Sequence, residues 1–463
     1  MNGQKAFVFD VNKCTGCAAC QIACSIENRV DAGISWRSVH TFNPRHVPGV
    51  PSFHHSIACN HCVDPPCMKH CPALAYSKDP STGAVTINAD SCIGCKYCSW
   101  ACPYDAPRFN TKSGTMEKCT FCTHRLDEGL EPACAALCPT GALQYGDHEQ
   151  AGGPAVPGFT QTEIGPAIRF VALRKWTGSA AVTNEAHTRA GGYAPAAAPA
   201  RINLRSEWTL MAFSLVAALL VGRYASALVA PSPGQWGASG FAPAGPLHPL
   251  VPLFFGMGAM ALSTLHLGRR NRAWRAVLNW RRSWVSREVL LFPAFLVAAT
   301  AALAMGPSGP GGFAGWFGAA LGFAALFAVD NVYRVTRAQG LRLHSAQVIV
   351  TGLLFAGMFS ANGVLFALVA AAKAFMYLWR KYNMYSERQE ARPWFTRARV
   401  LIGLAAPLVM WWKGGAHWYP AVVACVVVGE LIDRAEFYLE LDAPSPARQM
   451  DADLAALFPQ KKG

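Results

Sequence analysis

The chain has 463 residues, a net charge of +14 and a mean hydropathy of +0.19, a value that averages two unlike halves. Residues 201–463 hold 25 of the 41 Lys and Arg residues but only 12 of the 27 Asp and Glu residues. Because this basic excess lies in connections between apolar stretches, and not in a patch with interleaved aromatic residues, binding of nucleic acid is not indicated.

Cysteine is the most informative residue type in the amino-terminal part. Sixteen of the seventeen cysteines lie between residues 14 and 138, in four groups of four. The groups are Cys14, Cys17, Cys20 and Cys24; Cys59, Cys62, Cys67 and Cys71; Cys92, Cys95, Cys98 and Cys102; and Cys119, Cys122, Cys134 and Cys138. The first and third groups have the run C-x2-C-x2-C-x3-C, which with a proline after its last cysteine is the bacterial ferredoxin ligand pattern. A proline follows the last cysteine of the second, third and fourth groups. Four [4Fe-4S] clusters would use all sixteen thiols, which predicts a chain that transfers single electrons.

Two other uses of cysteine were weighed against this one. Disulfides form in oxidising compartments, and we expect no signal peptide before Cys14. Zinc can be held by C-x2-C pairs, but a cysteine at every third residue does not fit a tetrahedral structural site. Because iron clusters are assembled where thiols stay reduced, we expect the cluster-bearing part to mature in the cytoplasm.

The rest of the chain has a different organisation. Residues 177–202 are rich in Ala, Gly and Pro, lack an apolar period, and are expected to form a linker. Residues 203–442 contain apolar stretches of roughly 20 residues, the length that crosses about 30 Å of hydrocarbon. We predict eight spans, at 207–230, 247–268, 287–306, 314–335, 343–360, 363–380, 397–413 and 418–440, followed by a tail over 443–463.

Basic residues between the predicted spans indicate an orientation. The connections after the second, fourth and sixth spans hold seven, three and six Lys or Arg residues, whereas those after odd-numbered spans hold only Lys413. By the positive-inside rule, the iron–sulfur domain and both termini then lie on the cytoplasmic side of the membrane. Alternatively, these arginines form a docking surface for the cluster domain, whichever side it occupies.

Ionisable residues within a bilayer are costly and therefore mark candidate functional sites. His266 ends the predicted second span and Glu288 opens the third, so we expect both to bind quinone or relay its protons. The alternatives are that His266 caps a helix or meets lipid headgroups, and that Glu288 pairs with Arg287 or another arginine. Six further residues are expected mainly in structural ion pairs or at snorkelling ends: Asp330, Arg334, Lys373, Glu430, Asp433 and Arg434.

Several of these motifs resemble a known family. KCTGCAACQIAC, CNHCVDPPCMKHCP, CIGCKYCSWACP and KCTFC…PACAALCP, in residues 1 to about 150, resemble the four-cluster iron–sulfur subunit of the dimethyl sulfoxide reductase family of molybdenum enzymes. From about residue 201, SEWTLMAFSL, STLHLG and SWVSREVL resemble that family's eight-helix, quinol-oxidising anchor subunit. These are usually separate proteins, so the chain is similar to a fusion of both. It departs from the family at Arg270, where a proline is often found.

The resemblance implies an α+β fold for residues 1–176: two pseudo-symmetric, ferredoxin-like halves with two [4Fe-4S] clusters each. An all-α, eight-helix transmembrane quinone-binding domain follows over 203–442. It also implies that each group lends its last cysteine to another group. The four implied ligand sets are Cys14, Cys17, Cys20 and Cys138; Cys24, Cys119, Cys122 and Cys134; Cys59, Cys62, Cys67 and Cys102; and Cys71, Cys92, Cys95 and Cys98.

The function implied by the resemblance is electron transfer in the bacterial cytoplasmic (inner) membrane, between menaquinone or ubiquinone and a separate molybdopterin-containing catalytic subunit. No pterin-binding domain is recognised, so no molybdenum cofactor is expected in this chain. Haem b is not expected either, although His248 with His417, and His266 with His344, could face one another in pairs. Two alternatives remain: the same route in reverse, as in sulfite dehydrogenases, and a quinone-linked electron carrier or redox sensor without a molybdenum partner.

Overall fold

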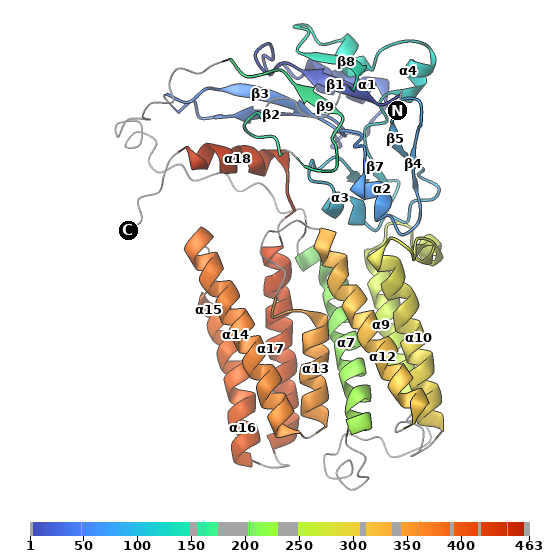
Figure 1. The fold of residues 1–463 in the computed structure, drawn as a ribbon, viewed down its shortest axis with the longest axis vertical. Coiled ribbons are helices and arrows are strands. Elements are labelled where there is room, and N and C mark those ends of the chain that lie inside the picture. The colour runs from blue at the N-terminus through green and yellow to red at the C-terminus, as the bar shows by residue number, and fades with distance from the viewer. Residues whose placement is uncertain are drawn as a thin grey trace. The chain divides into compact units, whose positions relative to one another are not determined.

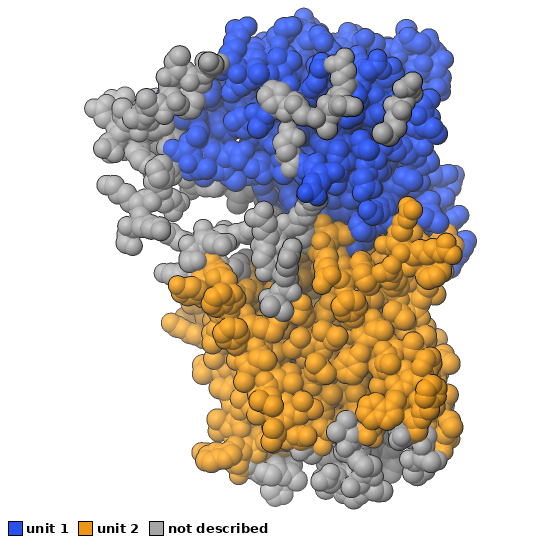
Figure 2. All heavy atoms as spheres, in the orientation of Figure 1, with its two compact units in different colours: residues 1–201, 267–275, 443–463 blue, residues 202–266, 276–442 orange. Residues whose placement is uncertain are grey.

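The computed structural model describes residues 3–47, 49–148, 155–160, 162–174, 202, 204–229, 249–305, 312–335, 344–360, 362–388, 393–414, 418–441 and 443–457. The chain forms two compact units, whose elements and extents are drawn in Figures 1 and 2. Unit 1 comprises residues 1–201, 267–275 and 443–463, and unit 2 comprises residues 202–266 and 276–442. Residues 177–201 of the predicted linker lie outside the described residues.

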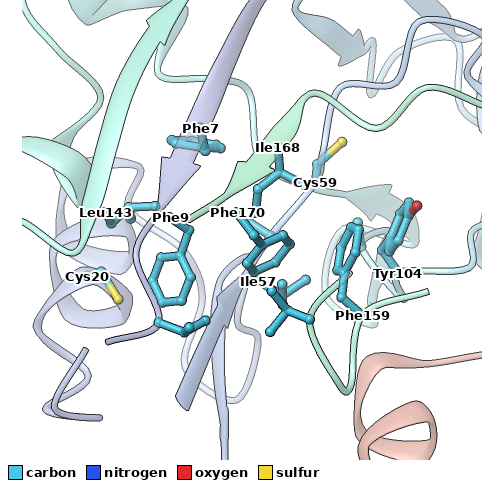
Figure 3. Packing of buried hydrophobic residues seen from close by; sticks show 14 of the residues in the cluster. Phe7, Phe9, Cys20, Ile57, Cys59, Tyr104, Leu143, Phe159, Ile168 and Phe170 are labelled. Carbon is cyan, nitrogen blue, oxygen red and sulfur yellow. The ribbon is translucent and has the colours of Figure 1, made fainter. Parts of the chain in front are cut away.

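A three-stranded sheet in the order β8–β1–β9 forms the middle of unit 1. Strand β1 (Lys5–Phe9) pairs antiparallel with β8 (Leu143–Asp147) and parallel with β9 (Ile168–Phe170). Phe7 and Phe9 are two residues apart, so their side chains lie on the same face of the strand. Both are 1% exposed and pack in the core that Figure 3 shows, together with Ile57, Leu143 and Phe170.

Short hairpins and short helices make up most of the remainder of unit 1. The hairpins pair β2 (Ser38–Phe42) with β3 (Phe53–Ile57), β4 (Tyr76–Lys78) with β5 (Val85–Ile87), and β6 (Arg108–Asn110) with β7 (Thr115–Glu117). The helices are α1 (Ala19–Glu27), α2 (Pro66–Lys69), α3 (Tyr97–Ala101), α4 (Thr123–Asp127) and α5 (Ala133–Ala136). Helix α1 packs against α5, and α2 packs against α3. This packing brings the first cysteine group to the fourth, and the second to the third.

Two segments that are distant in sequence complete unit 1. In residues 267–275, the backbone N–H of Gly268 donates to Gly94 O at 3.3 Å and that of Arg269 donates to Ile93 O at 3.1 Å. Helix α18 (Pro446–Ala456) begins at Ser445, whose side chain accepts the N–H of Arg448, and buries Met450 and Leu454 in the core of unit 1. The predicted tail therefore contains a packed helix.

Unit 2 is helical. Its helices include α7 (Leu204–Val229), α9 (Leu250–Ser263), α10 (Trp284–Ala304), α12 (Phe313–Val332), α13 (Val348–Phe359), α14 (Gly363–Arg388), α15 (Pro393–Val400), α16 (Ala406–Gly414) and α17 (Tyr419–Glu440). Helices α7 and α13 approach closely at Gly222, where an added Cβ would lie 3.0 Å from the backbone nitrogen of Ala356. A glycine is needed at this crossing.

The prediction of eight membrane spans is wrong. Within the described ranges, four helices are long and apolar enough to cross a membrane: Leu204–Leu228, Trp284–Ala304, Phe313–Val335 and Gly363–Asn383. A fifth is added if Leu250–His266 and Arg270–Val277, which meet at a 111° bend, form one span. The other predicted spans contain helices, but α13 has only 12 residues, a π-helical turn at Leu401–Ala405 separates α15 from α16, and α17 carries several charged residues.

The charges on α17 belong to a buried ion-pair network. Its acidic members recur every three or four residues and so share one face of α17: Glu430, Asp433, Glu436 and Glu440. Lys373 on α14 donates to Glu430 Oε2 at 2.8 Å, and Arg399 on α15 donates to Glu430 Oε1 at 2.8 Å. These three side chains are fully buried. The network therefore connects α14, α15 and α17, as predicted for Lys373, Glu430 and Asp433.

Glu430→Gln is expected to lower the free energy of unfolding of unit 2 by about 3–5 kcal/mol, because it leaves two buried cations without their shared carboxylate. The measurement is denaturation in detergent micelles. Adding Lys373→Met should restore part of the loss, since Arg399 retains Asp433 at 3.7 Å. Glu440→Gln, at the partly exposed end of the network, is the matched control, and an equal loss in that variant would contradict the argument.

Candidate iron–sulfur sites and quinone site

The first predicted ligand set gathers around the start of α1. Cys14 and Cys17 precede α1, Cys20 lies on it, and Cys138 follows α5. Burial raises the pKa of the Cys14 thiol, and negative charge on Cys20, Cys138 and Cys17 raises it further, so these thiols are its charged neighbours. The backbone N–H of Leu143 donates to Cys138 Sγ at 3.4 Å. Cys138, distant in sequence, thus joins the first group.

The second set includes Cys24, which lies on α1 one turn after Cys20. Burial raises the pKa of Cys24 to about 12; Arg37 opposes this shift, and the thiolates of Cys134 and Cys122 add to it. Asn28 Nδ2 donates to Cys122 Sγ at 3.6 Å, and the N–H of Phe121 donates to Cys119 Sγ at 3.4 Å.

The third set lines a cavity. Cys59, Cys62, Cys67 and Cys102 all contribute to its wall, together with Lys118. These cysteines come from two sequence groups, since Cys102 is the last cysteine of the third group. The N–H of His61 donates to Cys59 Sγ at 3.4 Å. Converging buried thiols with nearby N–H donors fit the ligand requirements of a [4Fe-4S] cluster.

The fourth set is built around α3. Burial raises the pKa of Cys98, and negative charge on Cys95, Cys71 and Cys92 contributes to the same shift. The N–H of Ala75 donates to Cys71 Sγ at 3.4 Å. Cys92 Sγ accepts the N–H groups of Gly94 at 3.4 Å and Met116 at 3.5 Å. Thiols from two sequence groups are therefore neighbours in these sets, although no three His, Cys, Asp or Glu side chains among the described residues lie close enough together to hold a metal ion as they stand. The assignment of four cysteines to each cluster stays a prediction.

A shared backbone turn explains several of the N–H to sulfur bonds. In the first C-x2-C pair of each of the four groups, the residue just before the second cysteine has a positive φ: +69° at Gly16, 40° at His61, +68° at Gly94 and 64° at Phe121. This conformation favours glycine. At Gly16 an added Cβ would also lie 2.7 Å from the imidazole of His54, so both space and backbone conformation require glycine there.

Two buried cations beside the thiols were not predicted from the sequence. Arg37 and Lys118 are each 1% exposed. Burial lowers the pKa of Arg37, but negative charge on Cys134, Cys119, Cys20 and Cys24 outweighs it and raises the pKa above its usual value. The pKa of Lys118 is also raised above its usual value: burial lowers this pKa, but negative charge on Cys59, Cys67 and Cys119 raises it by more. In the sequence, the only indication of a cation beside the thiols was the position of Lys118 directly before Cys119.

His266 lies at the end of the 3₁₀ helix Thr264–His266, directly after α9, and is half-buried. Its Nδ1 is hydrogen-bonded to the carbonyl oxygen of Ser263. A bond to a carbonyl oxygen requires Nδ1 to carry the hydrogen, so Nε2 is the basic nitrogen of the neutral ring. This arrangement suits a proton acceptor.

Glu288 lies in the first turns of α10 and is also half-buried. The alternative pairing with Arg287 is not seen, because Arg287 donates to the carbonyl oxygens of Trp280 at 3.1 Å and Arg281 at 2.6 Å. The carboxylate lies within electrostatic reach of Tyr333 and Tyr438, whose hydroxyl groups are hydrogen-bonded to each other.

Asp330 and Arg434, two more of the ionisable residues predicted to have structural roles, make the contacts of such a role. Asp330 accepts the N–H groups of Val348 at 2.6 Å and Ile349 at 3.1 Å, at the start of α13. Arg434 donates to Ser214 Oγ at 3.0 Å and Thr351 Oγ1 at 3.2 Å.

The histidines considered for haem are only partly described. The ring of His344 accepts the N–H of Ala346 at 2.9 Å and is hydrogen-bonded by Arg380. His248 and His417 lie outside the described residues.

Comparisons with known proteins agree with the cysteine-rich site. A 4Fe-4S dicluster domain model matches residues 51–148. The chain is 39% identical over 158 residues to the probable anaerobic dimethyl sulfoxide reductase protein YnfG of Escherichia coli, covering 32% of this chain and 77% of the relative. It is 39% identical over 154 residues to one of the polypeptides of the anaerobic dimethyl sulfoxide reductase of E. coli, covering 32% and 75%. It is 37% identical over 165 residues to one of the subunits of the sulfite dehydrogenase of Allochromatium vinosum, covering 31% and 69%. By its amino-terminal part, the chain therefore belongs to the family of iron–sulfur subunits of dimethyl sulfoxide reductases, and its sixteen clustered cysteines are those of a [4Fe-4S] protein.

Proposed function

We propose that the chain carries electrons between the membrane quinone pool and a separate molybdopterin-containing catalytic subunit, through four [4Fe-4S] clusters. The observation that carries this proposal is that cysteines of different sequence groups are neighbours: Cys138 lies near Cys14, and Cys102 lines one cavity with Cys59, Cys62 and Cys67. When bound, each cluster would accept and release one electron at a time. The chain is then both the electron-transfer subunit and the membrane anchor, with residues 1–176 and 203–442 as its two functional domains.

Oxidation of a quinol releases two electrons and two protons, and the candidate quinone site offers acceptors for the protons. His266 presents a basic Nε2 because its Nδ1 is engaged by Ser263. Glu288 presents a carboxylate that Arg287 does not neutralise. Menaquinone and ubiquinone carry the same reacting oxygens, so either would suit these two groups.

The distribution of basic residues supports a location in the bacterial cytoplasmic membrane, with the iron–sulfur domain on the cytoplasmic side. Between α9 and the middle of α10 the chain carries Arg269, Arg270, Arg272, Arg275, Arg281, Arg282 and Arg287. Such clusters flank spans on the cytoplasmic side. The four or five candidate spans of unit 2 would hold the chain in the bilayer.

Direction of electron flow separates two candidate functions. Similarity to dimethyl sulfoxide reductase polypeptides favours a respiratory reductase, in which quinol is oxidised and electrons leave through the clusters. Similarity to a sulfite dehydrogenase polypeptide supports the reverse direction, in which quinone is reduced. The test adds a quinol analogue or sulfite separately to native membranes as the electron donor. Reduction of the clusters by the quinol analogue supports the reductase, and reduction by sulfite supports the reverse direction.

Purification in mild detergent from native membranes is expected to yield a molybdenum-bearing partner protein, with about sixteen iron atoms per copy of this chain. Mass spectrometry and metal analysis of the same fraction provide the measurement. Iron without molybdenum or a large co-purifying protein would contradict the proposed complex, and would favour a quinone-linked electron carrier or redox sensor.

A further inference from the structure

Arg37 is a buried cation whose hydrogen-bonding capacity is only partly used. Its Nη1 donates to the carbonyl oxygen of Ser56 at 3.2 Å and to Ser56 Oγ at 3.0 Å, and its guanidinium lies 4.5 Å from the centre of the Phe7 ring. The Nε and Nη2 atoms are buried without a hydrogen-bond partner. The charged groups around it are thiols, of Cys20 in the first ligand set and of Cys24, Cys119 and Cys134 in the second.

Lys118 is the second buried cation of unit 1. Its Nζ donates to the carbonyl oxygens of Val85 and, at 3.0 Å, Cys119. The side chain also lines the cavity formed by the cysteines of the third ligand set. Among the described Lys and Arg residues of unit 1, Arg37 and Lys118 are the two that are fully buried.

A buried charge is costly unless an opposite charge compensates it. Neither cation is paired with a carboxylate among the ion pairs of the described residues, and the negatively charged groups that act on both are thiols. A [4Fe-4S] core held by four thiolates is an anion, and it gains one further negative charge when it accepts an electron. The clusters therefore provide the missing countercharge, and a fixed cation favours the reduced cluster over the oxidised one.

We propose that Arg37 and Lys118 set the reduction potentials along the electron-transfer chain. Arg37 raises the potentials of the first and second clusters, because Cys20 and Cys24 are among its charged neighbours, and Lys118 raises the potential of the third and, through Cys119, of the second. This inference rests on the ligand sets of the proposed function. The cysteines of the fourth set have other thiols, and neither Arg37 nor Lys118, as their main charged neighbours, so the fourth cluster serves as an internal reference.

The test is a redox titration of the full-length chain in detergent, followed by electron paramagnetic resonance of the reduced clusters. Arg37→Met and Lys118→Met should each lower the reduction equilibrium constants of the affected clusters at least tenfold, which is about 59 mV for one electron. Arg37→Met should shift the first and second clusters, Lys118→Met the third and second, and both should leave the fourth cluster unchanged. Arg37→Lys and Lys118→Arg, which keep the charge, should shift them less.

Further variants keep the proposal testable if the clusters do not assemble in Arg37→Met. Ser56→Asp keeps Arg37 and places a carboxylate beside its Nη1, so it should lower the same potentials as Arg37→Met. Because Ser56 Oγ also lies 3.2 Å from Cys20 Sγ, Ser56→Ala controls for the loss of that contact and should shift the potentials less. Lys69→Met removes a cation from a half-exposed side chain two residues before Cys71, and should shift no cluster tenfold because water screens that charge.

Unchanged potentials in Ser56→Asp and Lys118→Met would overturn the proposal. Shifts in Arg37→Lys and Lys118→Arg as large as those in Arg37→Met and Lys118→Met would also overturn it, because the first two variants keep the charge. Too little iron in the unmodified chain would instead count against the ligand sets.

Discussion

The double variant Cys59→Ala/Cys102→Ala is expected to retain about three of its four [4Fe-4S] clusters, the same number as either single variant. Cys59 and Cys102 belong to different sequence groups but line one cavity. Once one ligand of a cluster is gone, loss of a second ligand of the same cluster removes nothing further. Spin counting on the dithionite-reduced protein, together with iron analysis, provides the measurement.

The comparison variant is Cys92→Ala/Cys102→Ala, in which both cysteines belong to the third sequence group. It is expected to retain only about two intact clusters, because Cys92 is assigned to the fourth ligand set and Cys102 to the third. If each sequence group instead held its own cluster, the two results would be exchanged. Cys425→Ala is the control: this half-buried cysteine on α17 lies far in sequence from the sixteen, and its loss should leave the iron content unchanged.

Loss of any one cluster should also interrupt electron flow. A series of carriers conducts only if every link can be reduced and reoxidised, so a variant lacking the third cluster should fail to pass electrons from quinol to the catalytic subunit. Reduction of its remaining clusters by dithionite, which does not need the full series, should continue.

The sequence predicted the iron–sulfur part well because the ligand spacing is local. A cysteine three residues after another lies within reach of the same cluster, and the glycine at Gly16 or Gly94 favours the positive φ of the turn between them, which His61 and Phe121 adopt in the other two groups. The exchange of the last cysteine between groups came from resemblance to a family and stays a prediction; the packing of α1 on α5 and of α2 on α3 brings the paired groups near each other.

The features that the sequence did not predict depend on contacts between distant residues. Arg37 lies near Cys134 only because the segment before β2 and helix α5 are brought together by folding. In unit 2, apolar stretches predicted helices correctly but overstated how many can span a membrane, since hydropathy averaged over a window does not reveal the π-helical turn at Leu401–Ala405 or the charges that α17 buries. The pairing of Glu288 with Arg287 was a reasonable expectation from adjacency alone, but Arg287 donates to backbone carbonyl groups instead.

His266→Ala and Glu288→Gln are each expected to slow quinol-driven reduction of the clusters by about 100-fold or more, the range in which positioned proton acceptors contribute. In the first variant the basic Nε2 is lost; in the second, the amide cannot accept a proton from quinol. Neither residue is a cluster ligand, so the iron content and the dithionite-reduced spectrum should match those of the unmodified chain. Stopped-flow mixing with a quinol analogue, monitored by cluster absorbance, measures the rate.

Glu440→Gln is the matched control for the carboxylate, because Glu440 lies on α17 and is held by Lys381 and Arg380, in the ion-pair network and outside the candidate quinone site. Its rate should stay within a factor of about two, since its removal takes no proton acceptor from the quinol. Unchanged rates in both His266→Ala and Glu288→Gln would contradict the quinone assignment while leaving the clusters in place. A rate loss in Glu440→Gln as large as that in Glu288→Gln would mean that any disturbance of unit 2 slows the reaction, and the carboxylate of Glu288 would then have no special role.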